Sequence, residues 1–511
     1  MQKPYRVIIM KLKHLKSGTD VRGVAVNNEN PEKIDLTDEA VCRIAYSFAE
    51  FLANKNNIKK DGLVISVGHD SRISAERIKD NVISALAYAG CEIKDCSLCS
   101  TPAMFMTTKL LGCNGAIQIT ASHHPWDRNG LKFFTKDGGL SGDEVLSILD
   151  FAENNYVPAG VLKANIQKVD FLPVYCEHLR EMIKKGVKSE DYDRPLEGLK
   201  IVVDAGNGAG GFYASGVLES LGADTSGSRY LDPDGMFPNH IPNPENEQAM
   251  ESIREATLNS GADLGIIFDT DVDRGGCVSA DGKEINRNRL VALAASIALE
   301  ENPGGTIVTD SVTSAGLTRF INKNLGGVHR RFRRGYKNVI DEAQRLESEG
   351  ISSPLAIETS GHAAFKENYF LDDGAYLVTK IIIKLAAMKK QNRELDDLIR
   401  ELIEPAEEKE VRLKITEPDF KLYGEKVLKF ISRYAAENAD WYETDDSFEG
   451  IKIIFSDIDS FFIFRLSVHD PVMPINFESA QKGGIKIAAK RLYDALKPFS
   501  GLSKSTLEQI L

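Results

Sequence analysis

Apolar runs recur along the chain, and three of them end in a turn of small or polar residues. These runs are LVISVGHDSR from Leu63, LKIVVDAGNGAGG from Leu199 and GGTIVTDSVTSAG from Gly304. A short apolar run that is rich in β-branched residues and stops at such a turn is typical of a buried strand. Each run therefore predicts a strand that leads into a helix.

A second short strand is predicted after each of these helices, and it ends in side chains that can bind or react. These strands are GAIQITASHHP from Gly115, LGIIFDTDVDR from Leu264 and LAIETSGHAAF from Leu355. Open α/β sheets bind their ligands at the carboxyl ends of their strands. We expect three related α/β domains with mixed sheets, each presenting one functional loop.

The end of the chain has a different pattern. An acidic, helix-forming stretch precedes the hairpin pattern GIKIIFSDIDSFFIFRLSVHDP and the basic helical stretch IKIAAKRLYDAL. This order predicts a fourth, smaller α+β domain. A chain of 511 residues is too long for one hydrophobic core, and we place the four domains at residues 1–165, 166–300, 301–408 and 409–511.

Composition narrows the class of protein. The net charge of −12 argues against nucleic acid or a membrane surface as partner. The seven cysteines are too scattered for a disulfide framework, and the amino terminus has no signal-peptide pattern. The longest apolar helix candidate, Leu290 to Leu299, is too short to span a bilayer. We expect a cytoplasmic protein, and nothing in the sequence indicates its oligomeric state.

Three aspartates follow the apolar run LGIIF at alternate positions. In an extended segment Asp269, Asp271 and Asp273 would project to one side, where their mutual repulsion favours a bound cation. Hard oxygen ligands favour Mg²⁺. An EF-hand is excluded because Arg274 and Ala280 stand where that loop needs glycine and glutamate. The alternative is a solvated acidic turn.

The stretch ITASHHPWDRNG places Ser122 at a strand end, next to an imidazole and a rigid proline. Such a serine can act as a nucleophile or phosphate carrier, and Lys132 could balance a phosphate charge. An ordinary turn serine is the alternative.

In the third repeat, ETSGH offers a carboxylate, hydroxyls and an imidazole for sugar hydroxyls, unless it is only a satisfied polar turn. The nearby RRFRRGYKNV is either a solvated basic loop or an attractor for an anion.

Two further motifs have other interpretations. GNGAGG, Gly206 to Gly211, matches the dinucleotide-binding pattern, but no strand ends in an acidic residue at the expected offset. Cys96 and Cys99 form a lone CxxC pair, which favours packing over redox chemistry.

Read in order, the functional loops resemble those of the α-D-phosphohexomutase family over nearly the whole chain. TASHHP resembles the family's T-A-S-H-N-P phosphoserine loop, DTDVDR its D-G-D-A-D-R metal loop, and ETSGH its E-x-S-G-H sugar loop. TDVRG and GYK are similar to the family's Y-D-I-R-G and G-F-K segments. The resemblance implies four domains around a central cleft and a mutase of the phosphoglucomutase/phosphomannomutase type.

The resemblance also implies roles for particular residues. Ser122 would carry the phosphate, with Arg22, His123 and Lys132 as its catalytic neighbours. Mg²⁺ would be held by a phosphate oxygen on Ser122 and by Asp269, Asp271 and Asp273. The substrate would be a hexose phosphate, a hexose 1,6-bisphosphate would be intermediate and activator, and the substrate-binding residues would be Arg274, Lys337, Glu358, Ser360, His362, Arg465, Ser467 and His469.

The sequence departs from the family at two places. The fourth-domain phosphate loop, commonly R-x-S-G-T-E-P, reads RLSVHDP here, so Val468 replaces a flexible glycine and His469 a threonine. His124 stands where the family usually has asparagine, and we assign it no role.

Other functions remain open at this point. A phosphoglucosamine mutase would share these loops. IIFDTDV also fits a haloacid-dehalogenase-type phosphatase, with Asp269 as nucleophile and Asp372 and Asp373 as distant metal ligands. A hexose-phosphate sensor without catalysis would keep the same pockets. Neither the preferred sugar nor the general acid and base can be assigned from the sequence.

Overall fold

The computed structural model describes residues 10–27, 29–155, 165–444, 447–467 and 470–511. The chain divides into two compact units, residues 1–297 with 360–398, and residues 298–359 with 399–511. No helix in the described ranges is long and apolar enough to cross a lipid bilayer.

The first sheet has eight strands, in the order β1-β2-β6-β5-β3-β4-β8, with β7 paired to β6. It is mixed, since β3 pairs in parallel with β4 and β5 whereas β5 and β6 are antiparallel. Its strands are β1 (Lys16–Ser17), β2 (Asp20–Val24), β3 (Val64–His69), β4 (Glu92–Leu98), β5 (Gly115–Ile119), β6 (Arg128–Thr135), β7 (Gly138–Gly139) and β8 (Ile166–Lys168).

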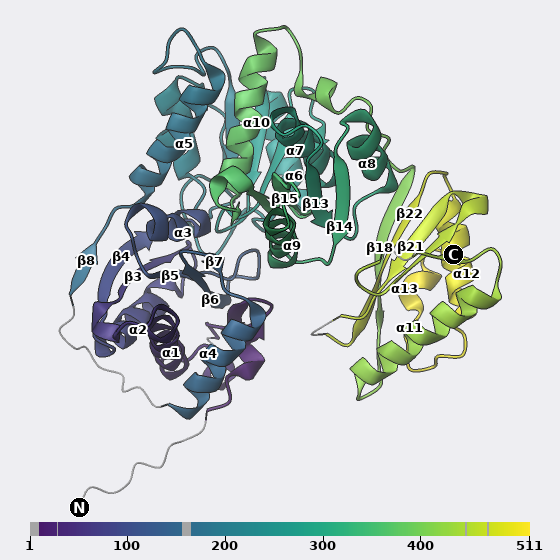
Figure 1. Cartoon of the computed structure of the whole chain (residues 1–511), viewed down its shortest axis with the longest axis horizontal. Coiled ribbons are helices and arrows are strands. Elements are labelled where there is room, and N and C mark those ends of the chain that lie inside the picture. The colour runs from purple at the N-terminus through teal and green to yellow at the C-terminus, as the bar shows by residue number, and fades with distance from the viewer. Residues whose placement is uncertain (1–9, 28, 156–164, 445–446, 468–469) are drawn as a thin grey trace, which may run out of the picture. The chain divides into compact units, whose positions relative to one another are not determined.

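Helices cover both faces of this sheet, as Figure 1 shows, with α1, α2 and α4 on one side and α3 on the other. Their bounds are α1 (Asp38–Asn56), α2 (Ala75–Tyr88), α3 (Thr101–Leu110) and α4 (Gly142–Asn154). Apolar side chains of α1, α2 and α4 form one core with β3 and β5. Because β8 pairs with β4, the first sheet extends past residue 165, where we place the first domain border. The four borders remain a prediction.

The second sheet has the order β12-β11-β10-β9, and its parallel pair β9/β10 carries the metal loop at the end of β10. Its strands are β9 (Ile201–Asp204), β10 (Leu264–Phe268), β11 (Gly275–Ser279) and β12 (Glu284–Ile285). The same unit contains the antiparallel pair β16 (Ala363–Phe365) and β17 (Leu371–Asp372). Its further helices are α5 (Leu172–Val187), a π-helix (Tyr213–Leu218), α6 (Glu247–Ser260), most of α7 (Arg287–Glu301) and α10 (Gly374–Lys389).

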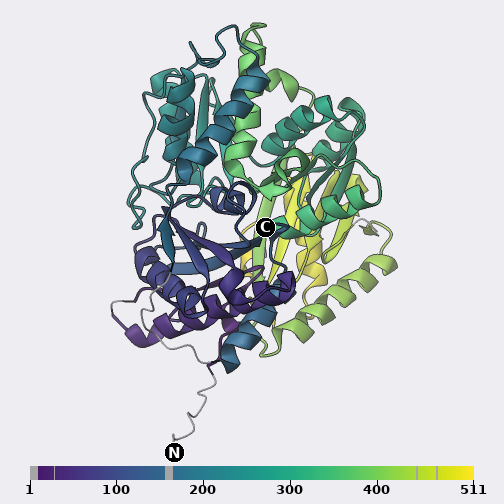
Figure 2. The same ribbon diagram turned by 60° about the vertical axis from the view of Figure 1, so that its left-hand side comes forward.

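The second unit contains two sets of strands. The parallel strands are β13 (Thr306–Asp310), β14 (Val328–Phe332) and β15 (Leu355–Ile357), with helices α8 (Ala315–Arg319) and α9 (Tyr336–Ser348). The antiparallel sheet has the order β18-β22-β21-β20-β19, formed by β18 (Glu407–Lys414), β19 (Tyr442–Glu443), β20 (Ile451–Phe455), β21 (Ser460–Phe464) and β22 (Val472–Ser479). Its helices are α11 (Phe420–Glu437), α12 (Gly484–Ala495) and α13 (Ser505–Glu508), drawn in light green and yellow in Figure 2.

These elements confirm the expected fold class, three α/β domains with mixed sheets and a smaller α+β domain. The predicted strands at Leu63, Leu199 and Gly304 are β3, β9 and β13, and their partners are β5, β10 and β15. The predicted hairpin is β20 and β21. Strand β18 was not expected, because the acidic residues at its start suggested a helix.

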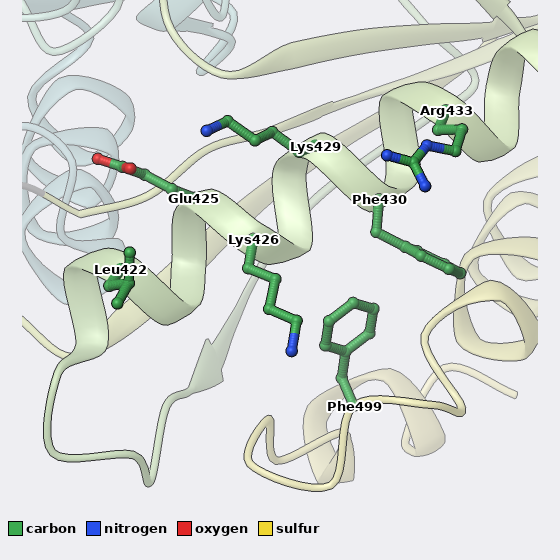
Figure 3. A pocket seen from close by; sticks show the side chains of 7 residues that line it. All are labelled: Leu422, Glu425, Lys426, Lys429, Phe430, Arg433 and Phe499. Atoms are coloured by element: carbon green, nitrogen blue, oxygen red, sulfur yellow. The ribbon is translucent and has the colours of Figure 1, made fainter.

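A cavity of about 520 Å³ lies beside α11, where Figure 3 shows the side chain of Lys426 near Phe499, whose ring contacts that of Phe430. Its lining residues are Leu422, Glu425, Lys426, Lys429, Phe430, Arg433 and Phe499. None of the predicted site residues lies among them.

The two ambiguous motifs take structural roles. Burial raises the pKa of the Cys96 thiol to about 12, and both Cys96 and Cys99 are buried free thiols, as the packing interpretation predicts. In GNGAGG, Ala209 N donates to Thr270 O over 2.7 Å, so the glycine-rich turn packs against the loop that follows β10.

We predict that Gly208→Ala destabilises the protein. A Cβ at position 208 would lie 2.6 Å from Thr270 O, too close for any side chain, so the metal loop would have to move. Overpacking of this kind costs about 1–3 kcal/mol and lowers the melting temperature in differential scanning fluorimetry. Gly62→Ala, which meets no atom within 4 Å, is the control. Equal melting temperatures for the two variants would contradict this explanation of the motif.

Candidate active site

The loop after β10 brings three carboxylates together in the interior. Ligand oxygens of Asp269, Asp271 and Asp273 lie within 4.8 Å of one another, and all three side chains are buried. We expected an extended segment to bring these carboxylates to one side, but residues 269–273 do not belong to a strand. The strand ends at Phe268, and Val272 adopts a φ of 71°, which is strained for a β-branched residue. The turn, not the alternate spacing, makes the carboxylates converge.

Lys132 on β6 supplies a positive charge to this cluster. Its Nζ donates to Asp271 Oδ2 over 3.0 Å and also to Asp273, and the side chain is only 3% exposed. Burial alone would raise the pKa of Asp273, but the neighbouring Lys132 holds it below its usual range. Burial and the other two carboxylates raise the pKa of Asp269. The Arg274 guanidinium is a second positive charge, with its Nε 4.0 Å from Asp269 Oδ2. Two positive charges therefore stand beside three carboxylates.

The remaining oxygens fit a divalent cation. Among the described residues, Asp271 Oδ1 and Asp273 Oδ1 are buried and have no hydrogen-bond partner. Orphaned buried acceptors are rare in folded proteins, and carboxylate oxygens are the ligands that Mg²⁺ prefers. The donor set of this loop thus suits Mg²⁺.

Ser122 faces the same cluster from the loop after β5. Its Oγ donates to Asp269 Oδ2 over 2.9 Å, and the residue is 1% exposed. His123 Nδ1 lies 3.2 Å from the same Oγ. Ser122 has a φ of 51°, a left-handed conformation that is uncommon outside glycine. The predicted nucleophile and the predicted metal ligands are therefore in direct contact.

Two more predicted residues lie near this serine. Arg22 on β2 pairs with Asp20, with 2.8 Å between Nη2 and Oδ2. Burial and then the charge of Arg274 lower the pKa of His123 to about 2, and Arg22 contributes to the same shift. His123 is consequently a neutral imidazole that can accept or donate a hydrogen bond.

Arg274 and His362 form the next part of the site. They face each other through an isolated β-bridge, and Arg274 Nε donates to His362 Nε2 over 2.9 Å. Because arginine can only donate, the proton of a neutral His362 is on Nδ1, which lies 2.6 Å from Asp372 Oδ2. Asp273, His362 and Asp372 could in principle hold a cation, but a protonated Nδ1 is not a ligand. The buried Ser360 precedes this bridge.

Glu358 and Lys337 belong to the second unit. Glu358 is 4% exposed, and its Oε1 accepts a hydrogen bond from Gly335 N over 2.6 Å, at the start of α9. Lys337 lies in the first turn of α9 and pairs with Asp341. The sugar-loop carboxylate thus fixes the turn that carries the predicted lysine.

Arg465 lies near a second arginine in the same unit. Its Nη2 is 3.9 Å from Glu410 Oε2, which is 3.6 Å from Arg334 Nη1. Burial and the charge of Arg334 lower the pKa of Arg465. Arg334 Nε also lies 3.8 Å from Asp310 Oδ2. Two neighbouring guanidinium groups with donors in a planar fork are suited to bind an anion such as phosphate. Ser467 follows, and its Oγ accepts a hydrogen bond from Asp470 N over 3.2 Å, whereas His469 lies outside the described residues.

Sequence reasoning missed three residues of the site. Thr101, at the start of α3, donates its hydroxyl to Asp271 and its N–H to Asp271 O. Asp372 was considered only as a phosphatase ligand, and its contact with His362 depends on the β16–β17 turn. Arg72 lies in the quoted stretch GHDSR and binds the Ser122 loop. No local pattern distinguishes these residues from ordinary turn residues.

Comparison with known proteins decides the family. Residues 14–155, 173–282 and 286–406 match in turn the family models for α/β/α domains I, II and III of phosphoglucomutase/phosphomannomutase. A phosphoglucomutase/phosphomannomutase of Thermococcus kodakarensis is 30% identical over 484 residues, which cover 93% of this chain and 98% of that protein. The chain belongs to the phosphoglucomutase/phosphomannomutase family.

Other members of the family are also similar to this chain over most of its length. A phosphomannomutase/phosphoglucomutase of Pseudomonas syringae is 28% identical over 464 residues, 90% of each chain. The crystal structure of a family protein from Burkholderia thailandensis has the same fold, with a TM-score of 0.77, 24% identity and coverage of 96% of this chain and 98% of its own. As a member of this family, the chain is a phosphohexomutase, an isomerase that moves a phosphoryl group within a hexose phosphate.

We predict that Mg²⁺ stabilises this phosphohexomutase against unfolding. Binding to the folded state at 100 times its dissociation constant adds about 2.7 kcal/mol, so the melting temperature should rise by several degrees relative to chelator. Asp271→Asn should reduce the rise, because one ligand charge is lost. Asp281→Asn, on an exposed turn, should leave it unchanged. A wild-type protein with the same melting temperature in Mg²⁺ and in chelator would contradict the metal assignment.

Proposed function

We propose that the chain catalyses reversible phosphoryl transfer between the 1- and 6-positions of glucose and/or mannose through a phosphoserine at Ser122. The observation that carries the proposal is the 2.9 Å contact of Ser122 Oγ with Asp269, inside a buried carboxylate cluster that Lys132 also enters. The names of the similar proteins from Thermococcus and Pseudomonas support glucose and mannose as the sugars.

The reaction has two half-reactions. In the first, the P–Oγ bond of phosphoserine breaks as phosphorus bonds to the free hydroxyl oxygen of a hexose monophosphate. The hydroxyl proton passes to a base of the site, Oγ regains a proton, and hexose 1,6-bisphosphate forms. In the second, the other phosphate returns to Oγ, which gives up its proton to the sugar oxygen that the phosphate leaves. Added hexose 1,6-bisphosphate would load an unphosphorylated serine in the same way and so act as activator.

The residues around Ser122 can balance the moving charge. Asp269, Asp271, Asp273 and an oxygen of the phosphoserine would hold Mg²⁺, which supplies positive charge to the transferring phosphoryl group. Lys132 contributes a fixed ammonium in a buried site, where such charges act strongly. Arg22 and the neutral His123 would contact the phosphate oxygens.

The remaining predicted residues would bind the substrate. The sugar hydroxyls and nearby oxygens would form hydrogen bonds with Glu358, Ser360, His362 and Arg274. The second phosphate would be bound by Lys337, Arg465, Ser467 and His469, so that binding energy at the distal end positions the reacting end.

Small hexose phosphates are the expected partners. All seven cysteines are buried free thiols, which agrees with a cytoplasmic location.

We predict that Ser122→Ala abolishes turnover while substrate binding persists, because the serine carries the phosphate and distant contacts carry the affinity. Coupled assays with the 1-phosphates of glucose, mannose and glucosamine measure turnover and also identify the sugar. Calorimetry measures binding. Ser147→Ala, an exposed serine of α4, is the control. Near wild-type turnover by Ser122→Ala would overturn the proposed mechanism.

We predict that Arg465→Ala raises KM and lowers kcat/KM, because a charge-assisted contact to phosphate is lost. The fall in kcat/KM should correspond to a loss of about 2–4 kcal/mol in transition-state binding. Steady-state kinetics test this, and intact mass should still show that the chain carries one phosphate. Arg412→Ala is a matched control, since Arg412 binds the same Glu410 but is 64% exposed. If KM in Arg465→Ala equals the wild-type value, the distal phosphate is bound elsewhere.

A further inference from the structure

Arg72 is a fully buried cation with no role in the reaction described above. It lies between β3 and α2 and is 2% exposed. Burying a guanidinium is expensive unless it is paired and all its N–H groups are satisfied. Asp70, which is also buried, provides the pair, since Arg72 Nε donates to its Oδ2 over 3.2 Å and Arg72 N to its Oδ1 over 2.9 Å.

The other four N–H groups of this guanidinium all reach the serine loop. Nη1 donates to Pro125 O over 2.6 Å and to Arg128 O over 2.9 Å. Nη2 donates to Ser122 O and, over 2.6 Å, to His124 O. A guanidinium has five donors in a rigid fork, and here one binds Asp70 while four bind main-chain carbonyls of a single loop. Lysine could not replace this pattern.

The loop that Arg72 binds has a strained backbone at Ser122, the proposed nucleophile. The φ of 51° at Ser122 is a conformation that persists only where the surroundings determine it. Arg72 also has an aromatic neighbour, since the centre of the Phe237 ring lies 5.3 Å from the guanidinium carbon. A Cβ at Gly235 would lie 2.4 Å from Ile73 N, so this second-domain turn packs directly on the Arg72 turn.

We propose that Arg72 is the positioning residue of the phosphoserine loop. It holds the main chain at residues 122 to 128 so that the strained Ser122 keeps its Oγ directed at Asp269. The effect on turnover rests on the proposed function of Ser122, whereas the effect on the loop does not.

Arg72→Lys tests this inference, because it keeps the buried charge and removes the fork. We expect kcat to fall about 100-fold with little change in KM, since a small misplacement of a reacting group has an effect of this size. Hydrogen exchange measured by mass spectrometry should increase in the peptide around residues 119–131. In Arg72→Ala, added methylguanidine should restore part of kcat by refilling the site.

Arg43→Lys is the matched control. Arg43 is 1% exposed in the same domain and pairs with Glu39 on α1, away from the serine loop. It should lose comparable thermal stability, keep kcat and leave exchange at residues 119–131 unchanged.

Three results would overturn the inference. They are a wild-type kcat in Arg72→Lys, an equal loss of kcat in Arg43→Lys, or unchanged exchange of the serine loop in Arg72→Lys. If the wild-type protein itself never phosphorylates Ser122, the proposed function fails, and the exchange measurement still decides the role of Arg72.

Discussion

Negative charge concentrated in the protein interior is the constraint on which the site depends. Asp269, Asp271 and Asp273 are all buried, and unit charges 4 Å apart repel by about 4 kcal/mol at an effective dielectric constant of about 20. Neighbouring groups offset part of this charge, namely the Lys132 ammonium, the Arg274 guanidinium and the hydroxyls of Thr101 and Ser122. The three carboxylates therefore suit a divalent cation, and the proposed mechanism uses that cation to bind the phosphate on Ser122.

The first domain supplies most of the groups that donate hydrogen bonds to these carboxylates. Lys132 comes from the middle of its sheet, Ser122 from the loop between β5 and β6, and Thr101 from the start of α3. Arg72 then fixes the serine loop through four main-chain carbonyls. In the proposed mechanism a rigid position for the serine matters, because phosphoryl transfer gains its rate from positioning and electrostatics.

The sequence predicts the strand ends that carry the chemistry, because apolar runs and polar turns are local signals. It also predicts that Ser122, Lys132 and the three aspartates act together. It does not predict how they meet. The left-handed backbone at Val272 is a conformation that the residue type disfavours, and the partners Arg72, Thr101 and Asp372 are distant in sequence. The acidic β18 was missed for the same reason: its pairing with β22 is a contact distant in sequence.

The most direct measurement is phosphopeptide mapping after the Mg²⁺-loaded protein has been incubated with hexose 1,6-bisphosphate. Because the Ser122 hydroxyl lies against the carboxylate cluster, we expect stable phosphate on the peptide that contains Ser122. Phosphate on Asp269 would instead identify a phosphatase of the haloacid-dehalogenase type, and an unmodified chain would identify a protein that only binds hexose phosphates. Either of these two results would contradict the account.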